Sequence, residues 1–253
     1  SVFVTGFPLP RENIGGPGMP TLKRDLLRRL ARLDRTGRFA AVFGPSVREL
    51  LGEEPPPEDR DVPVTVTFAV GGAGAQSEIG VALAESLRPA IRDGWLRLAL
   101  VAGVNPHIEE VFRAAVTRLG LEDALGHGVL IVREATKPAY FDRFNALLRE
   151  TDVLWTKPSE LSFYSGLGLP IVMAPPIGSH EAKNLRWLMN KGAALPQYRP
   201  ELALEWLRDL LRDGVLAEKA FSGFVKNRTL GVYKIEEVLR PGTLVREKHP
   251  LRR

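Results

Sequence analysis

The sequence predicts an α/β fold, a Rossmann-like parallel sheet with helices on both faces, preceded by an N-terminal helical appendage. From residue 62 onward, apolar segments of four to eight residues alternate with segments of helical periodicity, which is typical of βαβ units. These segments are apolar along most of their length, as expected when helices cover both faces of a sheet. The first of them, at 63–70, ends in a glycine-rich loop that leads directly into a helix.

Composition narrows the class of protein. The 253 residues are 44% hydrophobic and 26% charged, which is the profile of a soluble globular protein with a full core. There is no cysteine, and the four histidines are not paired at ligand spacing, so we expect no disulfide, no metal site and no cofactor. The absence of cysteine favours a cytoplasmic location.

The net charge of +5 would suit nucleic acid or an anionic membrane surface. Many arginines, however, alternate with leucines in the expected helix at 21–33, a pattern typical of a helix with a solvated basic face. We therefore expect no nucleic-acid partner. Peripheral contact of this helix with the inner face of the membrane stays open as an alternative.

Residues 1–60 are expected to form an inter-domain strand, a linker and the helical appendage. An acidic, proline-rich linker at 53–59 marks the boundary with the main domain, 61–253. The elements expected before this boundary are a strand at 2–5, helix 21–33, a short strand at 38–42 and a short helix at 46–51.

Five strands and seven helical segments are expected after the boundary. In order they are strand 63–70, helix 76–92, strand 96–102, helix 107–119, strand 128–132, helix 138–149, strand 152–156, helix 159–167, strand 169–174, and helices 180–191, 199–213 and 215–239. Because the carboxyl ends of parallel strands meet at one edge, we expect the polar residues that follow them to line one crevice.

The glycine-rich loop is the first candidate site. A strand–loop–helix order places backbone N–H groups at a helix N-terminus, where they can bind a phosphate. The candidate residues are Gly71, Gly72, Ala73, Gly74, Ala75 and Gln76. A tight turn without a ligand is the alternative.

Other polar groups follow later strands. His180, Glu181 and Asn184 lie in the first turns of one helix, with the i,i+4 spacing that puts His180 and Asn184 on one face. Alternatively they form the first turn of a helix capped by Ser179. Lys157 either pairs with phosphate or is solvated, and Trp155 is expected in the core.

These residues resemble the donor-binding domain of GT-B glycosyltransferases, in the group of the lipid II-forming N-acetylglucosaminyltransferase and monogalactosyldiacylglycerol synthase. Order and spacing agree over about residues 62–195. Three motifs carry the resemblance: the loop Gly71-Gly72-Ala73-Gly74-Ala75, the segment from Thr151-Asp152 to Gly168-Leu169-Pro170, and His180-Glu181 with Asn184 and Gly192-Ala193-Ala194. The opening Thr5-Gly6-Phe7-Pro8 also resembles the inter-domain strand of that family.

The resemblance implies a Rossmann-like half of a GT-B fold that binds a UDP-sugar without a metal, for transfer to an acceptor that is lipid-linked or otherwise near a membrane. It implies nucleotide and ribose contacts from Ser159, Glu160 and Ser162, and sugar contacts from His180, Glu181 and Asn184. Arg133, at the end of the third strand, is placed near the nucleotide by position alone. The family's general base belongs to an N-terminal half, so we assign no catalytic residue here and expect an isolated chain to be inactive.

Two departures keep other functions open. Ala73 replaces a loop serine of the family, and Phe163 stands where its ribose-binding glutamate is expected. Glu160, one turn earlier, either takes that role or favours the helix dipole. The alternatives are a nucleotide-sugar epimerase or hydrolase of the same architecture, and a non-catalytic binding module with a degenerate pocket.

Overall fold

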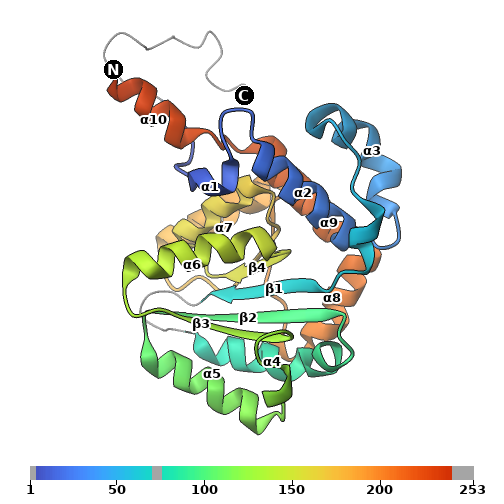
Figure 1. Cartoon of the computed structure of the whole chain (residues 1–253), viewed down its shortest axis with the longest axis vertical. Coiled ribbons are helices and arrows are strands. Elements are labelled where there is room, and N and C mark those ends of the chain that lie inside the picture. Colours follow the sequence, from blue (N-terminus) through green and yellow to red (C-terminus); the bar gives the residue numbers. More distant parts are fainter. Residues whose placement is uncertain (1–3, 70–75, 241–253) are drawn as a thin grey trace.

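A computed structural model of the chain describes residues 4–69 and 76–240 (Figure 1). Its centre is a six-stranded parallel sheet in the order β3-β2-β1-β4-β5-β6. The strands are β1 (Val64–Ala69), β2 (Leu96–Gly103), β3 (Val129–Arg133), β4 (Val153–Thr156), β5 (Ile171–Met173) and β6 (Ala194–Pro196). This is the strand order of the Rossmann fold, so the fold class expected from the sequence is confirmed.

Helices cover both faces of the sheet. The helices α4 (Ser77–Arg92) and α5 (Pro106–Arg118) lie on one face, and α6 (Lys137–Glu150) lies on the other (Figure 1). The remaining long helices are α2 (Pro20–Leu33), α3 (Arg38–Leu51), α7 (Ser179–Lys191), α8 (Ala203–Arg212), α9 (Val215–Lys226) and α10 (Gly231–Leu239). Shorter helical segments are α1 (Arg11–Ile14) and the 3-10 turns η1 (Pro57–Asp61), η2 (Glu122–Ala124), η3 (Glu160–Leu167) and η4 (Pro200–Leu202).

Several expected elements differ from the observed ones. The short strand at 38–42 is wrong, because α3 is one helix from Arg38 to Leu51. Its N-terminus is capped from outside the helix: the carboxylate of Asp34 accepts hydrogen bonds from the N–H groups of Phe39 and Ala40. Residues 4 and 5 are not in a strand, and the rest of the expected strand at 2–5 lies outside the described residues.

The C-terminal half also departs from expectation. Strand β6 was not expected from the sequence. It has three residues and lies at the edge of the sheet, so its sequence shows too little hydrophobic periodicity to predict a strand. The segment 159–167 forms the 3-10 turn η3, helix 199–213 begins with η4, and the long segment 215–239 divides into α9 and α10. The division follows Asn227, where the backbone is extended at φ −107° and ψ 146°.

The N-terminal segment shares its apolar core with the sheet domain. Five leucines of α2 are buried in the same cluster as the strands: Leu22, Leu26, Leu27, Leu30 and Leu33. These side chains are therefore not available as an apolar face for a membrane. Across the described residues, no helix is both long and apolar enough to span a bilayer. The division of the chain at residue 60 stays a prediction.

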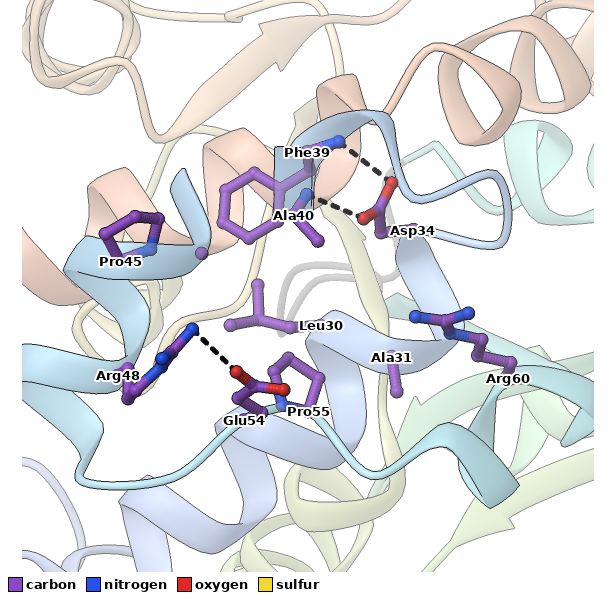
Figure 2. Close-up of a pocket in the computed structure, with 11 residues that line it drawn as sticks. Leu30, Ala31, Asp34, Phe39, Ala40, Pro45, Arg48, Glu54, Pro55 and Arg60 are labelled. Carbon is purple, nitrogen blue, oxygen red and sulfur yellow. Dashed lines mark hydrogen bonds and ion pairs between the residues drawn. The ribbon is translucent and has the colours of Figure 1, made fainter. Parts of the chain in front are cut away.

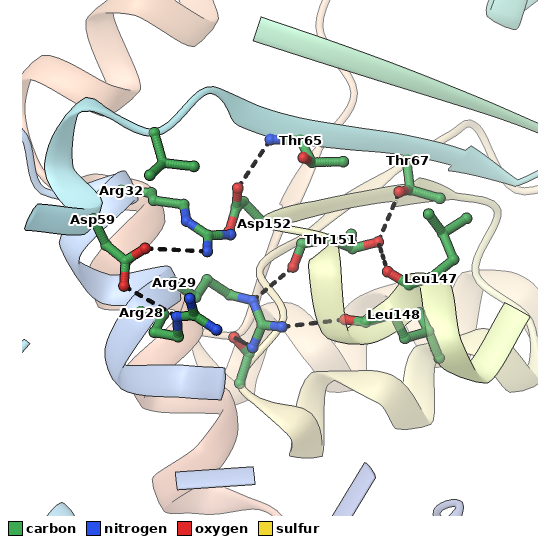
Figure 3. A network of polar contacts seen from close by, with 12 residues as sticks. Arg28, Arg29, Arg32, Asp59, Thr65, Thr67, Leu147, Leu148, Thr151 and Asp152 are labelled. Atoms are coloured by element: carbon green, nitrogen blue, oxygen red, sulfur yellow. Dashed lines mark hydrogen bonds and ion pairs between the residues drawn. The ribbon is translucent and has the colours of Figure 1, made fainter. Parts of the chain in front are cut away.

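A buried arginine joins α2 to the sheet domain (Figure 3). Arg29 is 2% exposed, so the expectation of a solvated basic face is wrong at this position. Its guanidinium donates to the carbonyls of Leu148 and Thr151 at the end of α6, at 3.2 and 2.8 Å. It also donates to those of Leu167 and Gly168 at the end of η3, at 2.9 and 3.2 Å. Arg29 therefore satisfies terminal carbonyls of two helical segments at once.

Acidic neighbours surround this arginine. Arg32, one turn after Arg29, pairs with Asp152 at 3.2 Å and with Asp59 at 3.5 Å, and Asp152 also accepts the N–H of Thr65 at 2.9 Å. Burial lowers the pKa of Arg29 to about 10, while Asp152 and Asp25 oppose the shift, so the guanidinium remains charged at neutral pH. Burial raises the pKa of Asp152, and Arg32 and the Thr65 N–H act in the opposite direction.

We predict that Arg29→Met lowers the free energy of unfolding by about 3 kcal/mol, because four buried carbonyls lose their charged donor. Arg24→Met on the same helix is the matched control, since the Arg24 side chain is 60% exposed and its ion pair to Asp25 is 3.6 Å long. Urea denaturation of both variants measures the difference. Equal effects of the two substitutions would contradict the role given to Arg29.

Candidate functional site

The carboxyl ends of β1, β4 and β5 lie next to one another, and side chains join the segments that follow them. Thr156, at the end of β4, is fully buried and donates its hydroxyl to the carbonyl of Ala69, at the end of β1, at 3.1 Å. The carbonyl of Thr156 accepts the N–H of Ala174, which follows β5, at 2.9 Å. The expected convergence of strand ends is therefore present for these three strands.

Of the expected diphosphate-binding loop, Gln76 is described, whereas Gly71, Gly72, Ala73, Gly74 and Ala75 lie outside the described residues. Gln76 precedes α4 with a positive φ of 72°, which is uncommon for a residue with a side chain. Its side-chain amide donates to the carbonyl of Pro175 at 3.1 Å. The start of α4 is thus tied to the loop after β5, across the intervening strand β4.

Lys157 and Glu181 form an ion pair at the centre of this edge. The Nζ of Lys157, just after β4, lies 3.0 Å from Oε1 of Glu181 in the first turn of α7. The other carboxylate oxygen accepts the N–H of Ile177 at 2.8 Å, and Glu181 is 3% exposed. Lys157, whose side chain is 24% exposed, is therefore paired within the protein, and Glu181 fixes the loop between β5 and α7.

The balance of forces on Glu181 favours its ionised form. Burial alone raises the pKa of this carboxyl, but the N–H of Ile177 and the ammonium of Lys157 more than offset it, so the pKa lies below its ordinary value of 4.5. At neutral pH the site consequently contains a compensated charge pair.

His180 and Asn184 flank the ion pair on α7. Asn184 donates its side-chain amide to the carbonyl of Pro158 at 3.2 Å, which links α7 to the segment after β4. His180 is exposed. The alternative in which Ser179 caps this helix is wrong, because the N-cap is Gly178 and makes no side-chain cap hydrogen bond.

Of the expected ribose-binding residues, Ser159 precedes η3, and Glu160 and Ser162 lie in the first turn of η3. Ser159 and Ser162 are both buried, and the N–H of Ser162 donates to the carbonyl of Ser159 at 3.1 Å. Within the described ranges, the hydroxyl of Ser162 has no hydrogen-bond partner and no contact with solvent. The backbone of Glu160 begins η3, and its side chain lies outside what the structure describes.

Arg133 lies apart from these residues. It is exposed at the end of β3, and its nearest acidic partner is Glu109 at 3.9 Å. Two strands, β2 and β1, separate β3 from β4 in the sheet. At the usual strand spacing this places Arg133 roughly 14 Å from the end of β4. The structure therefore does not bring Arg133 together with Ser159 and Ser162.

An aromatic cluster next to η3 was not expected from the sequence. Phe163 stacks on Phe7 of the N-terminal segment, with ring centroids 4.4 Å apart, and Phe7 meets Trp187 of α7 edge-on at 5.5 Å. Phe7 is held by a backbone hydrogen bond from its N–H to the carbonyl of Arg228 at 3.0 Å. At the position where the resemblance expects a glutamate, Phe163 thus stacks on Phe7 and remains 36% exposed. Trp155 is fully buried, as expected.

No group of three or more histidine and acidic side chains in the described part of the chain could hold a metal ion. The polar groups at this edge are suited instead to hydrogen bonding. The exposed imidazole of His180 and the N-terminus of α7 can contact an anionic or hydroxyl-rich ligand.

Comparison with known proteins gives distant similarities. Residues 121–235, less than half of the chain, match a family model described as "Domain of unknown function (DUF6938)". The processive diacylglycerol beta-glucosyltransferase of Bacillus subtilis (strain 168) is 26% identical over 125 residues, covering 49% of this chain and 30% of that protein. The enzyme of the same name from Bacillus licheniformis is 29% identical over 103 residues, covering 40% of this chain and 26% of that protein.

The chain thus spans less than a third of the length of these curated relatives, and it is distantly similar to glycosyltransferases. Among solved structures, a putative UDP-N-acetylglucosamine 2-epimerase from Listeria monocytogenes superimposes with a TM-score of 0.49 at 13% identity, covering 74% of this chain and 46% of that one.

The Lys157–Glu181 pair predicts a specific pH dependence of stability. Because the folded pKa of Glu181 is below 4.5, its stabilising effect is complete above that pH and is lost as the pH falls through the folded value. Glu181→Gln should therefore be less stable than wild type by about 1–3 kcal/mol at pH 7, and the difference should shrink under acid. Denaturation at pH 7, 5, 4 and 3 measures this.

Glu205→Gln is the control for that series, because Glu205 also lies in the first turn of a helix, α8, but is exposed. It should change the stability by less than about 0.5 kcal/mol at each pH. A pH-independent deficit in Glu181→Gln would show that packing, and not charge, is the main contribution of Glu181.

Proposed function

We propose that this chain contains the donor-binding domain of a glycosyltransferase, which binds a UDP-sugar at the carboxyl edge of the sheet. One observation carries the proposal: the segments after β1, β4 and β5 are held together there by side chains of Gln76, Lys157, Glu181 and Asn184. The distant similarity to a processive glucosyltransferase supports the reaction class.

The diphosphate is the ligand group that the glycine-rich loop, 71–75, suits best, since small residues allow close approach to backbone N–H groups. Preorganised N–H donors stabilise the leaving diphosphate as charge develops on it. In this proposal the loop, with Gln76 fixing the start of α4 against Pro175, performs that role without a metal.

The sugar is assigned to the N-terminus of α7. His180 is exposed and contacts the sugar hydroxyls directly. Glu181 and Asn184 are positioning residues here, because both oxygens of Glu181 and the amide of Asn184 are already engaged within the protein. They hold the loop after β5 and the segment after β4 at a fixed distance from α7.

The acceptor and its general base are assigned to a second domain, as in the GT-B glycosyltransferases that the sequence resembles. The acceptor is proposed to be lipid-linked, by analogy with the diacylglycerol in the names of the curated relatives. No residue of this chain is assigned a catalytic role.

We predict that UDP and UDP-sugars stabilise the chain against thermal unfolding, whereas GDP and ADP do not. At a concentration one hundred times the dissociation constant, the stabilisation should be about 2.7 kcal/mol. UDP should bind more tightly than uridine, because the loop is proposed to contact the diphosphate. Stabilisation by no nucleotide would favour the non-catalytic module, and turnover of UDP-sugar without an acceptor would favour an epimerase or hydrolase.

His180→Ala should weaken binding of UDP-sugars about tenfold and leave binding of UDP unchanged, since one hydrogen bond to the sugar is lost. His127→Ala is the matched control, because His127 is also exposed but precedes β3 at the opposite edge of the sheet. Isothermal titration calorimetry of both variants with UDP-glucose, UDP-N-acetylglucosamine and UDP tests the assignment. An equal loss of affinity for UDP would contradict a sugar contact.

A further inference from the structure

A second surface lies far from the carboxyl edge, on α3 and the segment that follows it. Helix α3 extends along the outside of the molecule, near the amino ends of the strands (Figure 1). Its inner side is buried through Phe39, Val47 and Leu51. On its outer side, Val42 is 70% and Leu50 is 40% exposed, and Pro45 is exposed as well. We call α3 and residues 52–61 the α3 surface.

A cavity of about 210 Å³ opens between α3, α2 and residues 54–60 (Figure 2). Its apolar lining includes Leu30, Phe39, Pro45 and Pro55. A cavity of about 150 Å³ is large enough to bind benzene, so this one has room for one large apolar side chain. A Cβ atom placed on Gly44, which also lines the cavity, would meet nothing within 4 Å, in agreement with an open space.

The charge of the α3 surface is opposite to that of the whole chain. Its exposed acidic residues are Glu49, Glu53, Glu54, Glu58 and Asp61, against the exposed cations Arg38, Arg48 and Arg60. Arg48 and Glu54 neutralise each other at 2.7 Å, and Arg38 pairs with Asp213 of the neighbouring helix end at 2.6 Å. The other exposed charged residues of the α3 surface are Glu49, Glu53, Glu58 and Asp61 against Arg60. The chain as a whole has a net charge of +5.

The charged residues that line the cavity balance one another, Asp34 and Glu54 against Arg48 and Arg60. The excess of exposed carboxylates lies beside this lining in the sequence, at Glu49, Glu53, Glu58 and Asp61. A surface with these carboxylates next to an apolar cavity selects a partner with apolar and basic groups.

We propose that the α3 surface is a docking site for a basic peptide segment of a partner protein, which inserts one large apolar side chain into the cavity beneath α3. Exposed apolar side chains beside a pocket are typical of interface hot spots, where a single anchor residue provides much of the affinity. Anionic lipid headgroups are disfavoured as the occupant, because the exposed carboxylates repel them. The proposal does not rest on the proposed sugar-nucleotide site, which lies at the opposite edge of the sheet.

Selection from a phage-displayed library of random dodecapeptides against the whole chain tests this proposal. The enriched peptides should contain one large aromatic or aliphatic residue flanked by lysines or arginines. The most enriched peptide, synthesised with a fluorescent label, should bind with an affinity that falls as salt is added. Its dissociation constant should rise at least about tenfold in the double variant Glu49→Lys/Glu53→Lys.

Filling the cavity provides the second test. Gly44→Trp should raise the dissociation constant at least about tenfold, whereas Gly44→Ala should change it less than about twofold. Glu85→Lys/Glu110→Lys is the charge control, because both residues are exposed and lie on α4 and α5, away from α3. Circular dichroism and thermal unfolding test whether each variant is folded. If a variant is not folded, Glu54→Gln or Val42→Ser takes its place in the binding measurement.

Several results would overturn the proposal. These are a selection without enrichment, enriched peptides that lack basic residues, or binding that the α3 variants leave unchanged. If the chain binds phosphatidylglycerol vesicles, and the charge variants change this binding, a membrane is the occupant instead. A concentration-dependent dimer in sedimentation, lost in Gly44→Trp, would identify a second copy of this chain.

Discussion

The guanidinium of Arg29 is the constraint on which the arrangement of the other parts depends. It lies inside the molecule and satisfies the last carbonyls of both α6 and η3. Neither end can move away from α2 without leaving buried carbonyls unpaired, which is costly. The neighbouring contacts of Arg32 with Asp152, and of Asp152 with Thr65, extend this connection to the starts of β4 and β1. The N-terminal helix thereby acts as a structural part of the sheet domain.

This connection bears on the candidate site because η3 runs from one edge of the sheet to the other. Arg29 holds the C-terminal end of η3 through Leu167 and Gly168, while Thr156 ties the strand before it to β1. At the carboxyl edge, the Lys157–Glu181 pair and the amide of Asn184 then set the position of α7. Phe7 packs against Phe163 of η3 and Trp187 of α7, so a change in the N-terminal segment can reach both elements of the site.

Much of the fold could be predicted because the strands are buried on both faces and are therefore apolar throughout, as in the all-buried run Val64–Ala69. The helical parts were less predictable. Residues 38–42 have the apolar character of a strand but begin helix α3. The carboxylate of Asp34, which precedes this helix in the chain, accepts the N–H groups of Phe39 and Ala40 and so caps its N-terminus. Strand β6 is set by pairing with β5, a long-range contact that three residues cannot signal.

The amino-acid sequence by itself determined the fold class, the presence of the first five strands, and the edge of the sheet at which polar residues gather, because these follow from local periodicity and from the geometry of parallel strands. Tertiary structure alone decided which partners those residues have. It joined Glu181 to Lys157 and placed Arg133 on β3, with two strands between it and β4. It also buried Arg29 in a helix whose sequence predicts a solvated basic face, and it stacked Phe163, at the position of the expected glutamate, on Phe7. Such contacts join residues far apart in the chain, and their energies depend on burial and on the exact approach of two groups, which no local pattern encodes.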